Sequence, residues 1–315
     1  MKKSAKSKAD PLADIGALET IGDWLRFAEK IYARENVALG QVATNAHDEA
    51  LYLLLRTLDV PLDSDPRVLT KKVSAAQRKK LSLMFRRRIV DRVPAAYLTQ
   101  EAWLGEHRFH VDERVIIPRS YFLEIIAGQL GDWLPKQGAA VRRVADVCTG
   151  SGCLAILLAH HFPKAHVDAA DLSSDALAVA KINVRDHRLT KRVSLFESDV
   201  FDQVPPAKYD VILSNPPYEP SALVDAQAPE FAAEPRMSHD GGADGLLIIR
   251  KLLRQASTRL KPHGIVLIEV GGLQSVINRE FAHLEPHWLH TQDGADCVCV
   301  IHAERLARST KSASR

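Results

Sequence analysis

Apolar side chains recur at helical spacing through the first third of the chain. A capping-box-like pair, Thr20 and Asp23, opens a helix that is predicted to run to about residue 37. A second helix is predicted over residues 47–58, before a proline, and a third begins at Ser74 with a glutamine three residues later. Together these segments predict a helical domain over residues 15–100.

From residue 140 onward, short apolar runs alternate with helical stretches. The runs predicted as strands are RRVADVC, AHVDAAD, RVSLFES, YDVILSN, GIVLIEV and DCVCVIH. This rhythm is typical of a doubly wound α/β domain, here over residues 120–306. Before it, the alternating segment RFHVDERVIIPRS predicts a strand or hairpin within a linker at residues 101–119. Both ends, residues 1–14 and 307–315, are basic and poor in large apolar residues, which predicts disordered tails.

Composition narrows the class of protein. The formal net charge of +3 is far from that of a dedicated nucleic-acid binder, and no apolar run approaches the roughly 18 to 20 residues that cross a bilayer. The N-terminus lacks the apolar stretch of a signal peptide, so a soluble, cytoplasmic protein without membrane contact is expected. The four cysteines sit in or beside apolar runs, which fits small core residues in a reduced compartment. The thirteen histidines show no metal-ligand spacing, and no metal is expected.

A glycine-rich turn follows the first strand. The run DVCTGSGCLAI places Gly150 and Gly152 between a strand and a helix, where glycine allows a tight turn close to a ligand. Together with Ala155, and with Asp171 at the end of the next strand to bind ribose hydroxyls, the pattern also fits a nicotinamide dinucleotide. The turn therefore predicts a nucleoside ligand and leaves two classes open.

Two further acids at strand ends favour one of these classes. Asp146, at the end of the first strand, would repel a pyrophosphate but suits the ammonium group of a methionine moiety. Asp199, after the third strand, is placed to accept a hydrogen bond from an adenine amino group. Together they favour S-adenosylmethionine as the cofactor.

The SNPPY motif follows the fourth strand, where a strand end hardly needs two prolines and an aromatic residue. Amide nitrogen is a poor nucleophile because its lone pair is delocalised, so it must be held against the methyl group with its hydrogens engaged by acceptors. The Asn215 side-chain oxygen and the Pro216 carbonyl can accept them, while Pro217 stiffens the loop and Tyr218 offers a face for a planar group. Such positioning can supply roughly 7 to 11 kcal/mol of barrier reduction. The motif predicts methylation of a planar amino or amide nitrogen.

The motif pair DVCTGSG and SNPPYEP resembles the class I methyltransferases that act on exocyclic amino or amide nitrogens. One branch methylates adenine N6 in nucleic acids, and the other, the HemK-like family, methylates protein glutamines. The segments RVPAAYLTQ, VIIPRS, FAAEPRMSHDGGADGL and LIEVGG extend the resemblance to the HemK-like family over residues 15–305. This resemblance implies a mostly parallel sheet with an antiparallel last strand, joined by a hairpin to a helical domain that recognises substrate. The cofactor residues that it implies are Asp146, Thr149, Gly150, Ser151, Gly152, Asp171, Leu172, Asp199, Val200 and Asn215.

The segment at residues 117–120, which reads IPRS, bears on the substrate. It resembles the branch that methylates a glutamine of the large-subunit ribosomal protein L three more than the branch that methylates release factors. Tyr121 departs from that branch, which usually has proline there. The implied partner is the ribosomal protein, free or within an assembly particle, and the basic helix at residues 78–92 is a possible contact for ribosomal RNA. A non-catalytic assembly factor that has kept a nucleoside pocket is the alternative from another class.

Overall fold

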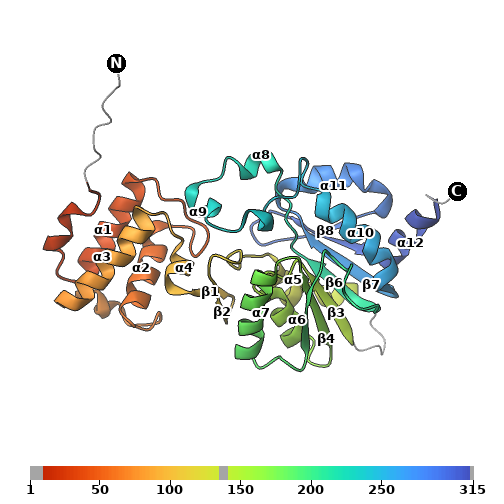
Figure 1. The fold of residues 1–315 in the computed structure, drawn as a ribbon, viewed down its shortest axis with the longest axis horizontal. Coiled ribbons are helices and arrows are strands. Elements are labelled where there is room, and N and C mark those ends of the chain that lie inside the picture. Colours follow the sequence, from red (N-terminus) through yellow and green to blue (C-terminus); the bar gives the residue numbers. More distant parts are fainter. Residues whose placement is uncertain (1–9, 135–140, 313–315) are drawn as a thin grey trace, which may run out of the picture. The chain divides into compact units, whose positions relative to one another are not determined.

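The computed structural model describes residues 10–134 and 141–312, which form two compact units (Figure 1). One unit ends at Glu101 and also includes the later segment Ala228–Ala233. The other comprises Ala102–Gln227 and the chain from Glu234 onward. The chain therefore passes from one unit to the other three times.

The first unit is built from the helices that the apolar periodicity predicts. The capping boxes Thr20–Asp23 and Ser74–Gln77 open α1 and α3, which confirms these two helix starts. Inside the unit, Trp24 stacks on Phe85, and both side chains are fully buried. Its elements are η1 (Ala13–Ala17), α1 (Ile21–Arg34), α2 (Ala46–Thr57), η2 (Pro66–Thr70), α3 (Ala75–Ile89), α4 (Ala95–Thr99) and α9 (Pro229–Ala232).

A buried ion cluster lies in the helical unit. The side chain of Arg88 is fully buried, and its Nε donates to Oε1 of Glu49 at 2.7 Å. Its Nη1 lies 3.5 Å from Oε1 of Glu230, which also pairs with Arg92 at 3.0 Å. Glu230 comes from α9, so a residue distant in the sequence helps to neutralise the basic end of α3.

This cluster removes Arg88 from the basic residues of the helix at 78–92 that could contact ribosomal RNA. Arg88 lies on the same helical face as the buried Leu81 and Phe85, so its charge is turned inward. Lys79 and Arg87 are exposed on α3. The exposed basic surface is smaller than the count of lysines and arginines suggests.

The α/β unit contains a seven-stranded sheet in the order β5-β4-β3-β6-β7-β9-β8. The strands β3 to β7 pair in parallel, whereas β9 is antiparallel to both β7 and β8. The predicted doubly wound, mostly parallel sheet with an antiparallel last strand is confirmed. Only β8 was not predicted, because three residues are too few to show an alternating pattern. The strands are β3 (Arg143–Val147), β4 (His166–Asp171), β5 (Val193–Glu197), β6 (Tyr209–Ser214), β7 (Leu260–Glu269), β8 (His287–Leu289) and β9 (Val298–His302).

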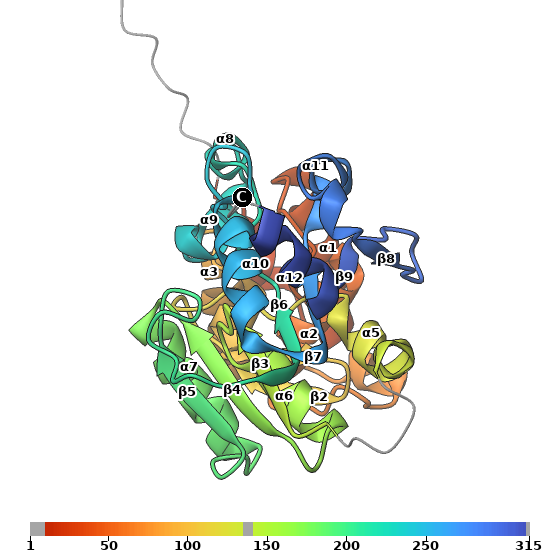
Figure 2. The same ribbon diagram turned by 90° about the vertical axis from the view of Figure 1, so that its right-hand side faces the viewer.

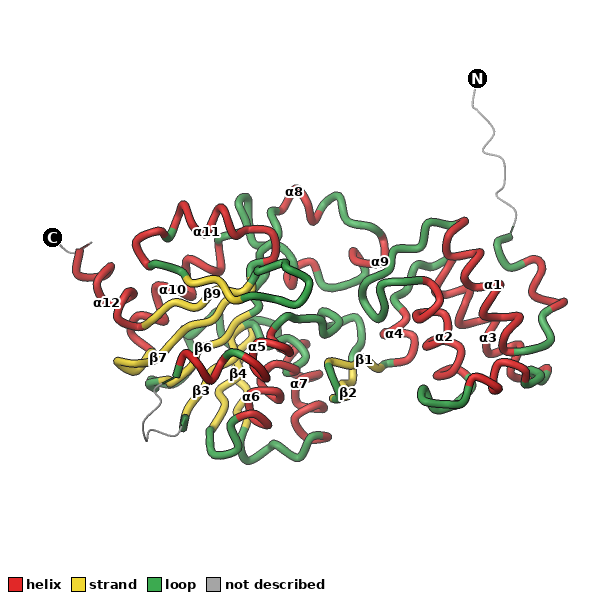
Figure 3. The backbone as a smooth tube through the Cα atoms, turned by 180° about the vertical axis from the view of Figure 1, so that it is seen from behind, coloured by secondary structure: helices red, strands yellow, loops and turns green. Residues whose placement is uncertain are grey.

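Helices cover both faces of this sheet (Figures 2 and 3). Val144 and Leu213 pack with α5 and α6 on one side, while Ala145 and Ile212 pack with α10 on the other. This alternation is what a sheet buried on both faces requires. The remaining helical elements of the unit are α5 (Phe122–Gly128), η3 (Leu130–Trp133), α6 (Cys153–His161), α7 (Ser174–Asp186), α8 (Ser221–Val224), η4 (Arg236–Ser238), α10 (Leu247–Arg259), η5 (Gly271–Leu273), α11 (Gln274–Glu280), η6 (Ala282–Leu284) and α12 (Ala303–Ser312).

The linker differs from its predicted form. The hairpin consists of β1 (Glu101–Leu104) and β2 (His107–His110), and residues 111–120 lie outside the strands. Val111, Val115 and Ile117 are nonetheless almost fully buried. Their burial in the core, without a partner strand, produces the same β-branched pattern that the sequence analysis interpreted as a strand.

The predicted tails are shorter in the structure, as far as it describes them. Leu12 is buried and the 3-10 helix η1 begins at Ala13, while α12 continues to Ser312 and buries Leu306. Residues 1–9 and 313–315 of the predicted tails lie outside the described residues. Across the described ranges, no helix has the length and apolar character that a membrane span needs.

Candidate active site

The predicted site residues gather at the carboxyl edge of the sheet. The parallel register aligns Val147 with Ser214 and Asp171 with Glu197, so β3, β4, β5 and β6 end at this edge. In doubly wound sheets ligands bind outside the carboxyl ends of the strands. The fold thus brings the glycine-rich turn, Asp171, Asp199 and the NPPY motif to the same side of the sheet.

The glycine-rich turn is held by hydrogen bonds to neighbouring elements. The N–H of Gly150 donates to Oδ2 of Asp171 at 2.8 Å, and the carbonyl of Ser151 accepts from Nδ2 of Asn183 at 2.8 Å. Gly152 has a φ of 79°, and a Cβ there would lie 3.1 Å from the Cβ of Ala180. Glycine is required at this position because the backbone is left-handed and α7 leaves little room.

Asp146 lies beneath the turn. Its side chain is fully buried, and Oγ1 of Thr149 donates to its Oδ2 at 2.5 Å. Burial raises the pKa of Asp146 to about 7. Its Oδ1 has no hydrogen-bond partner among the described residues, so one acceptor remains for a donor such as an ammonium group. Direct contact of Asp146 with the cofactor stays a prediction.

Asp171 and Asp199 have different surroundings. Both oxygens of Asp171 accept backbone N–H groups, from Gly150 at 2.8 Å and from Ser173 at 2.9 Å, which leaves further lone pairs for ribose hydroxyls. Burial raises the pKa of Asp171. Asp199 pairs through Oδ2 with Nζ of Lys251 at 2.6 Å. No local pattern in the sequence indicates Lys251, because α10 is distant from Asp199 along the chain.

Two apolar residues of the predicted cofactor set flank these acids. Leu172 is 55% exposed, so its side chain is accessible for contact with the flat face of a base. Val200 is buried and has a φ of 58°, a strained conformation for a β-branched residue. Their roles in binding stay predictions.

Asn215 is oriented by an acid that the motif does not contain. Its Nδ2 donates to Oε1 of Glu269 at 3.1 Å. The amide oxygen Oδ1 therefore faces away from Glu269 and can accept a hydrogen bond from another group. Glu269 ends β7, the strand next to β6 in the sheet. The carboxylate therefore fixes which end of the Asn215 amide serves as an acceptor.

Glu269 also binds the last residue of the IPRS segment and the residue that follows it. Its Oε2 accepts from Oγ of Ser120 at 2.5 Å and from the N–H of Tyr121 at 3.1 Å. Proline has no N–H, so the Tyr121 departure adds a donor to this carboxylate. Burial raises the pKa of Glu269 to about 7, against the effect of these donors. In the sequence, Glu269 lies in the LIEVGG segment, which contributes to the family resemblance but predicts no role for this residue.

The NPPY loop is packed tightly on glycines. A Cβ on Gly271, whose φ is 50°, would lie 2.5 Å from the ring of Tyr218. Burial raises the pKa of Tyr218 well above its usual value, so the phenol stays protonated. Tyr218 therefore acts as a neutral, fixed ring.

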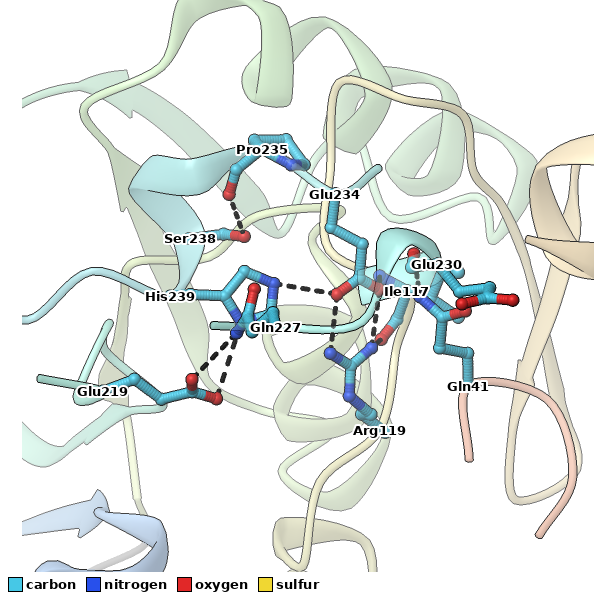
Figure 4. A network of polar contacts seen from close by, with 10 residues as sticks. All are labelled: Gln41, Ile117, Arg119, Glu219, Gln227, Glu230, Glu234, Pro235, Ser238 and His239. Carbon is cyan, nitrogen blue, oxygen red and sulfur yellow. Dashed lines mark hydrogen bonds and ion pairs between the residues drawn. The ribbon is translucent and has the colours of Figure 1, made fainter. Parts of the chain in front are cut away.

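Glu234 anchors the loop that follows the motif (Figure 4). Its carboxylate accepts from both terminal nitrogens of Arg119, at 2.7 and 2.6 Å, and from the N–H of Ile117 at 3.1 Å. His239 Nε2 lies 2.9 Å from it. Although burial opposes ionisation, Arg119 and His239 hold the pKa of Glu234 near 2. This bidentate pair ties the IPRS segment to the loop after NPPY.

The chain is similar to known methyltransferases in sequence. The family model of the methyltransferase small domain matches residues 129–233. The ribosomal protein uL3 glutamine methyltransferase of Neisseria gonorrhoeae is 42% identical over 92% of this chain and 96% of its own length. The protein of the same name from Bradyrhizobium diazoefficiens is 39% identical over 97% of this chain and 98% of its own.

The chain belongs to the uL3 glutamine methyltransferase family. Among solved structures, a methyltransferase domain of METTL16 is 16% identical over 62% of this chain and 87% of its own, with a TM-score of 0.45. The family assignment rests on the full-length relatives, which cover both the helical and the α/β unit. It agrees with the resemblance to glutamine methyltransferases, and the nicotinamide alternative is not supported.

Proposed function

We propose that this methyltransferase transfers a methyl group from S-adenosylmethionine to the side-chain nitrogen of a glutamine in ribosomal protein uL3, the large-subunit L three protein. The cofactor supplies an electrophilic methyl group on a sulfonium sulfur. Support for this cofactor comes from the donor and acceptor set at the sheet edge. Asp171 and Asp199 offer acceptors for hydroxyl and amino groups, and the orphan Oδ1 of Asp146 suits an ammonium group.

The substrate amide is held by acceptors. Oδ1 of Asn215, oriented by Glu269, and the carbonyl of Pro216 would accept the two amide hydrogens, while the ring of Tyr218 supports the amide plane. With its hydrogens held by Asn215 and Pro216, the nitrogen would be placed to take the methyl group, and the electron pair of the sulfur–methyl bond would stay with the departing cofactor. The nitrogen then loses a proton to water. The orientation of Asn215 by Glu269 is the observation that carries this proposal.

The substrate protein is proposed from the full-length relatives, whose names state uL3. It is presented free or in an assembly particle, where the exposed Lys79, Lys80, Arg86 and Arg87 are candidates for contact with ribosomal RNA. Incubation with labelled S-adenosylmethionine and either uL3 or a release factor tests the choice. We expect label on one glutamine of uL3, located by mass spectrometry. Label on the release factor alone would overturn the substrate, and binding of cofactor without any transfer would favour an assembly factor.

The state of Glu269 should set the pH dependence of catalysis. Its pKa is raised to about 7, so it is a carboxylate that accepts from Asn215 above this pH and is progressively protonated below it. We expect kcat/KM to fall below pH 7, by up to about tenfold per pH unit, because the neutral acid is a weaker acceptor for the Asn215 amide than the carboxylate is.

Two variants identify the group that causes this fall in kcat/KM below pH 7, the acidic limb of the pH profile. Glu269→Gln should be slower at every pH and lack the limb. Asp146 also has a pKa near 7, but it lies under the glycine-rich turn, so Asp146→Asn should lower the rate and keep the limb. If Asp146→Asn removes the limb and Glu269→Gln retains it, the role assigned to Glu269 is wrong.

A further inference from the structure

Three histidines that are far apart in the sequence meet in the α/β unit. His107 lies on β2, His160 in the last turn of α6, and His187 directly after α7. One potential ligand nitrogen from each lies within 4.8 Å of the others. The His107 and His160 rings are stacked with centroids 4.9 Å apart, and His187 lies 5.7 Å from both. None of them belongs to the candidate active site.

The surroundings leave nitrogen lone pairs available. Nε2 of His187 lies 2.9 Å from the carbonyl oxygen of Arg108, which can only accept, so Nε2 carries the proton and Nδ1 keeps a lone pair. A backbone carbonyl on the far nitrogen is the usual partner of a metal-binding histidine.

The backbone around the cluster is fixed by the buried Asn183 of α7. Its Oδ1 accepts from the N–H of His110 at 2.7 Å, and its Nδ2 donates to the carbonyl of His110 at 3.0 Å. These two bonds join β2 to α7, so His107 and His187 are carried on elements that are already attached to each other. His160 is exposed, which leaves a side open to solvent for a water ligand.

We propose that His107, His160 and His187 form a binding site for a divalent transition-metal ion that prefers imidazole, such as Zn²⁺. Three protein ligands and one water complete a tetrahedral shell, in which ligand nitrogens about 2.0–2.1 Å from zinc lie about 3.4 Å apart. Side-chain rotations that bring the nitrogens closer by up to about 1.4 Å would reduce the 4.8 Å limit to this value. The spacing of histidines in the sequence does not predict this site, because its three ligands come from separate elements.

The proposed ion would have a structural role. Both α6 and α7 begin at the carboxyl edge of the sheet, beside the glycine-rich turn. His160, in the last turn of α6, and His187, directly after α7, therefore lie at the opposite end. A metal there would join β2 to both helices without contacting the cofactor residues. Basal methyl transfer is therefore expected to be the same with and without the ion.

Zinc titration of the full-length, chelator-treated and untagged protein tests the site. We expect one equivalent of Zn²⁺ to bind and to raise the melting temperature. His160→Ala should weaken binding by at least about tenfold and remove the thermal shift. His161→Ala is the matched control, because His161 is adjacent and exposed but contacts Phe162 and lies outside the cluster.

Two results would overturn the proposal. One is the absence of a one-to-one complex with the wild-type protein. The other is an equal loss of affinity in the His160 and His161 variants, which would show nonspecific binding by surface histidines. Because His160 is exposed, its replacement by alanine should leave the fold intact, and circular dichroism without metal verifies this.

Discussion

Replacing Asn215 with alanine should lower kcat for methyl transfer by about a hundred- to a thousandfold while leaving cofactor affinity nearly unchanged. The side chain is the acceptor that Glu269 orients toward the substrate amide, and its loss leaves the nitrogen without a fixed position. Single-turnover kinetics on the uL3 substrate, paired with calorimetric titration of S-adenosylmethionine, separates the two effects.

The matched control for this variant is Asn278→Ala. Asn278 lies on α11, where its Oδ1 accepts from Nε1 of Trp288 at 2.8 Å in an exposed position outside the site. The same truncation there should change kcat by less than about twofold, as is usual for a surface substitution. An Asn215→Ala enzyme that turns over at the normal rate would remove this side chain from the mechanism.

Replacing Arg88 with leucine should lower the opening free energy of the helical unit by about 3–5 kcal/mol. The change leaves the almost fully buried Glu49 without its principal cation and leaves the equally buried Glu230 with Arg92 alone. Because a chain with two units need not unfold in one step, native-state hydrogen exchange on α2 and α3 is the suitable measurement.

Arg87→Leu provides the control for charge and helix propensity. It removes the same charge from the adjacent, exposed position of α3, and we expect a change within about 0.5 kcal/mol. Equal protection of α2 and α3 in both variants would show that the buried pair contributes no more than a surface arginine.

The sequence was informative where local pattern and chemistry coincide. The strand and helix rhythm predicted the doubly wound sheet, and the capping residues predicted the starts of α1 and α3. The positions of Asp171 and Asn215 at strand ends follow directly from that topology, because parallel strands end at one edge.

What the sequence could not supply was the partner of each polar side chain. Glu269 orients Asn215, Lys251 pairs with Asp199, and Glu230 approaches Arg88, each across a long stretch of chain. Local periodicity contains no information on such pairings, which depend on how distant elements pack. For the same reason, a count of basic residues could not distinguish the buried Arg88 from the exposed Arg87.

The assignment of residues 228–233 to the helical unit affects how the protein is made. The first hundred residues leave the ribosome early, yet Glu230, which pairs with Arg88 and Arg92, is synthesised only after most of the central sheet. Until then, Arg88 has only Glu49 as its acidic partner, and Arg92 lacks the carboxylate with which it pairs in the folded protein. Completion of the N-terminal unit during translation therefore depends on a segment from the second half of the polypeptide, and a fragment ending at Glu101 would lack this closing contact.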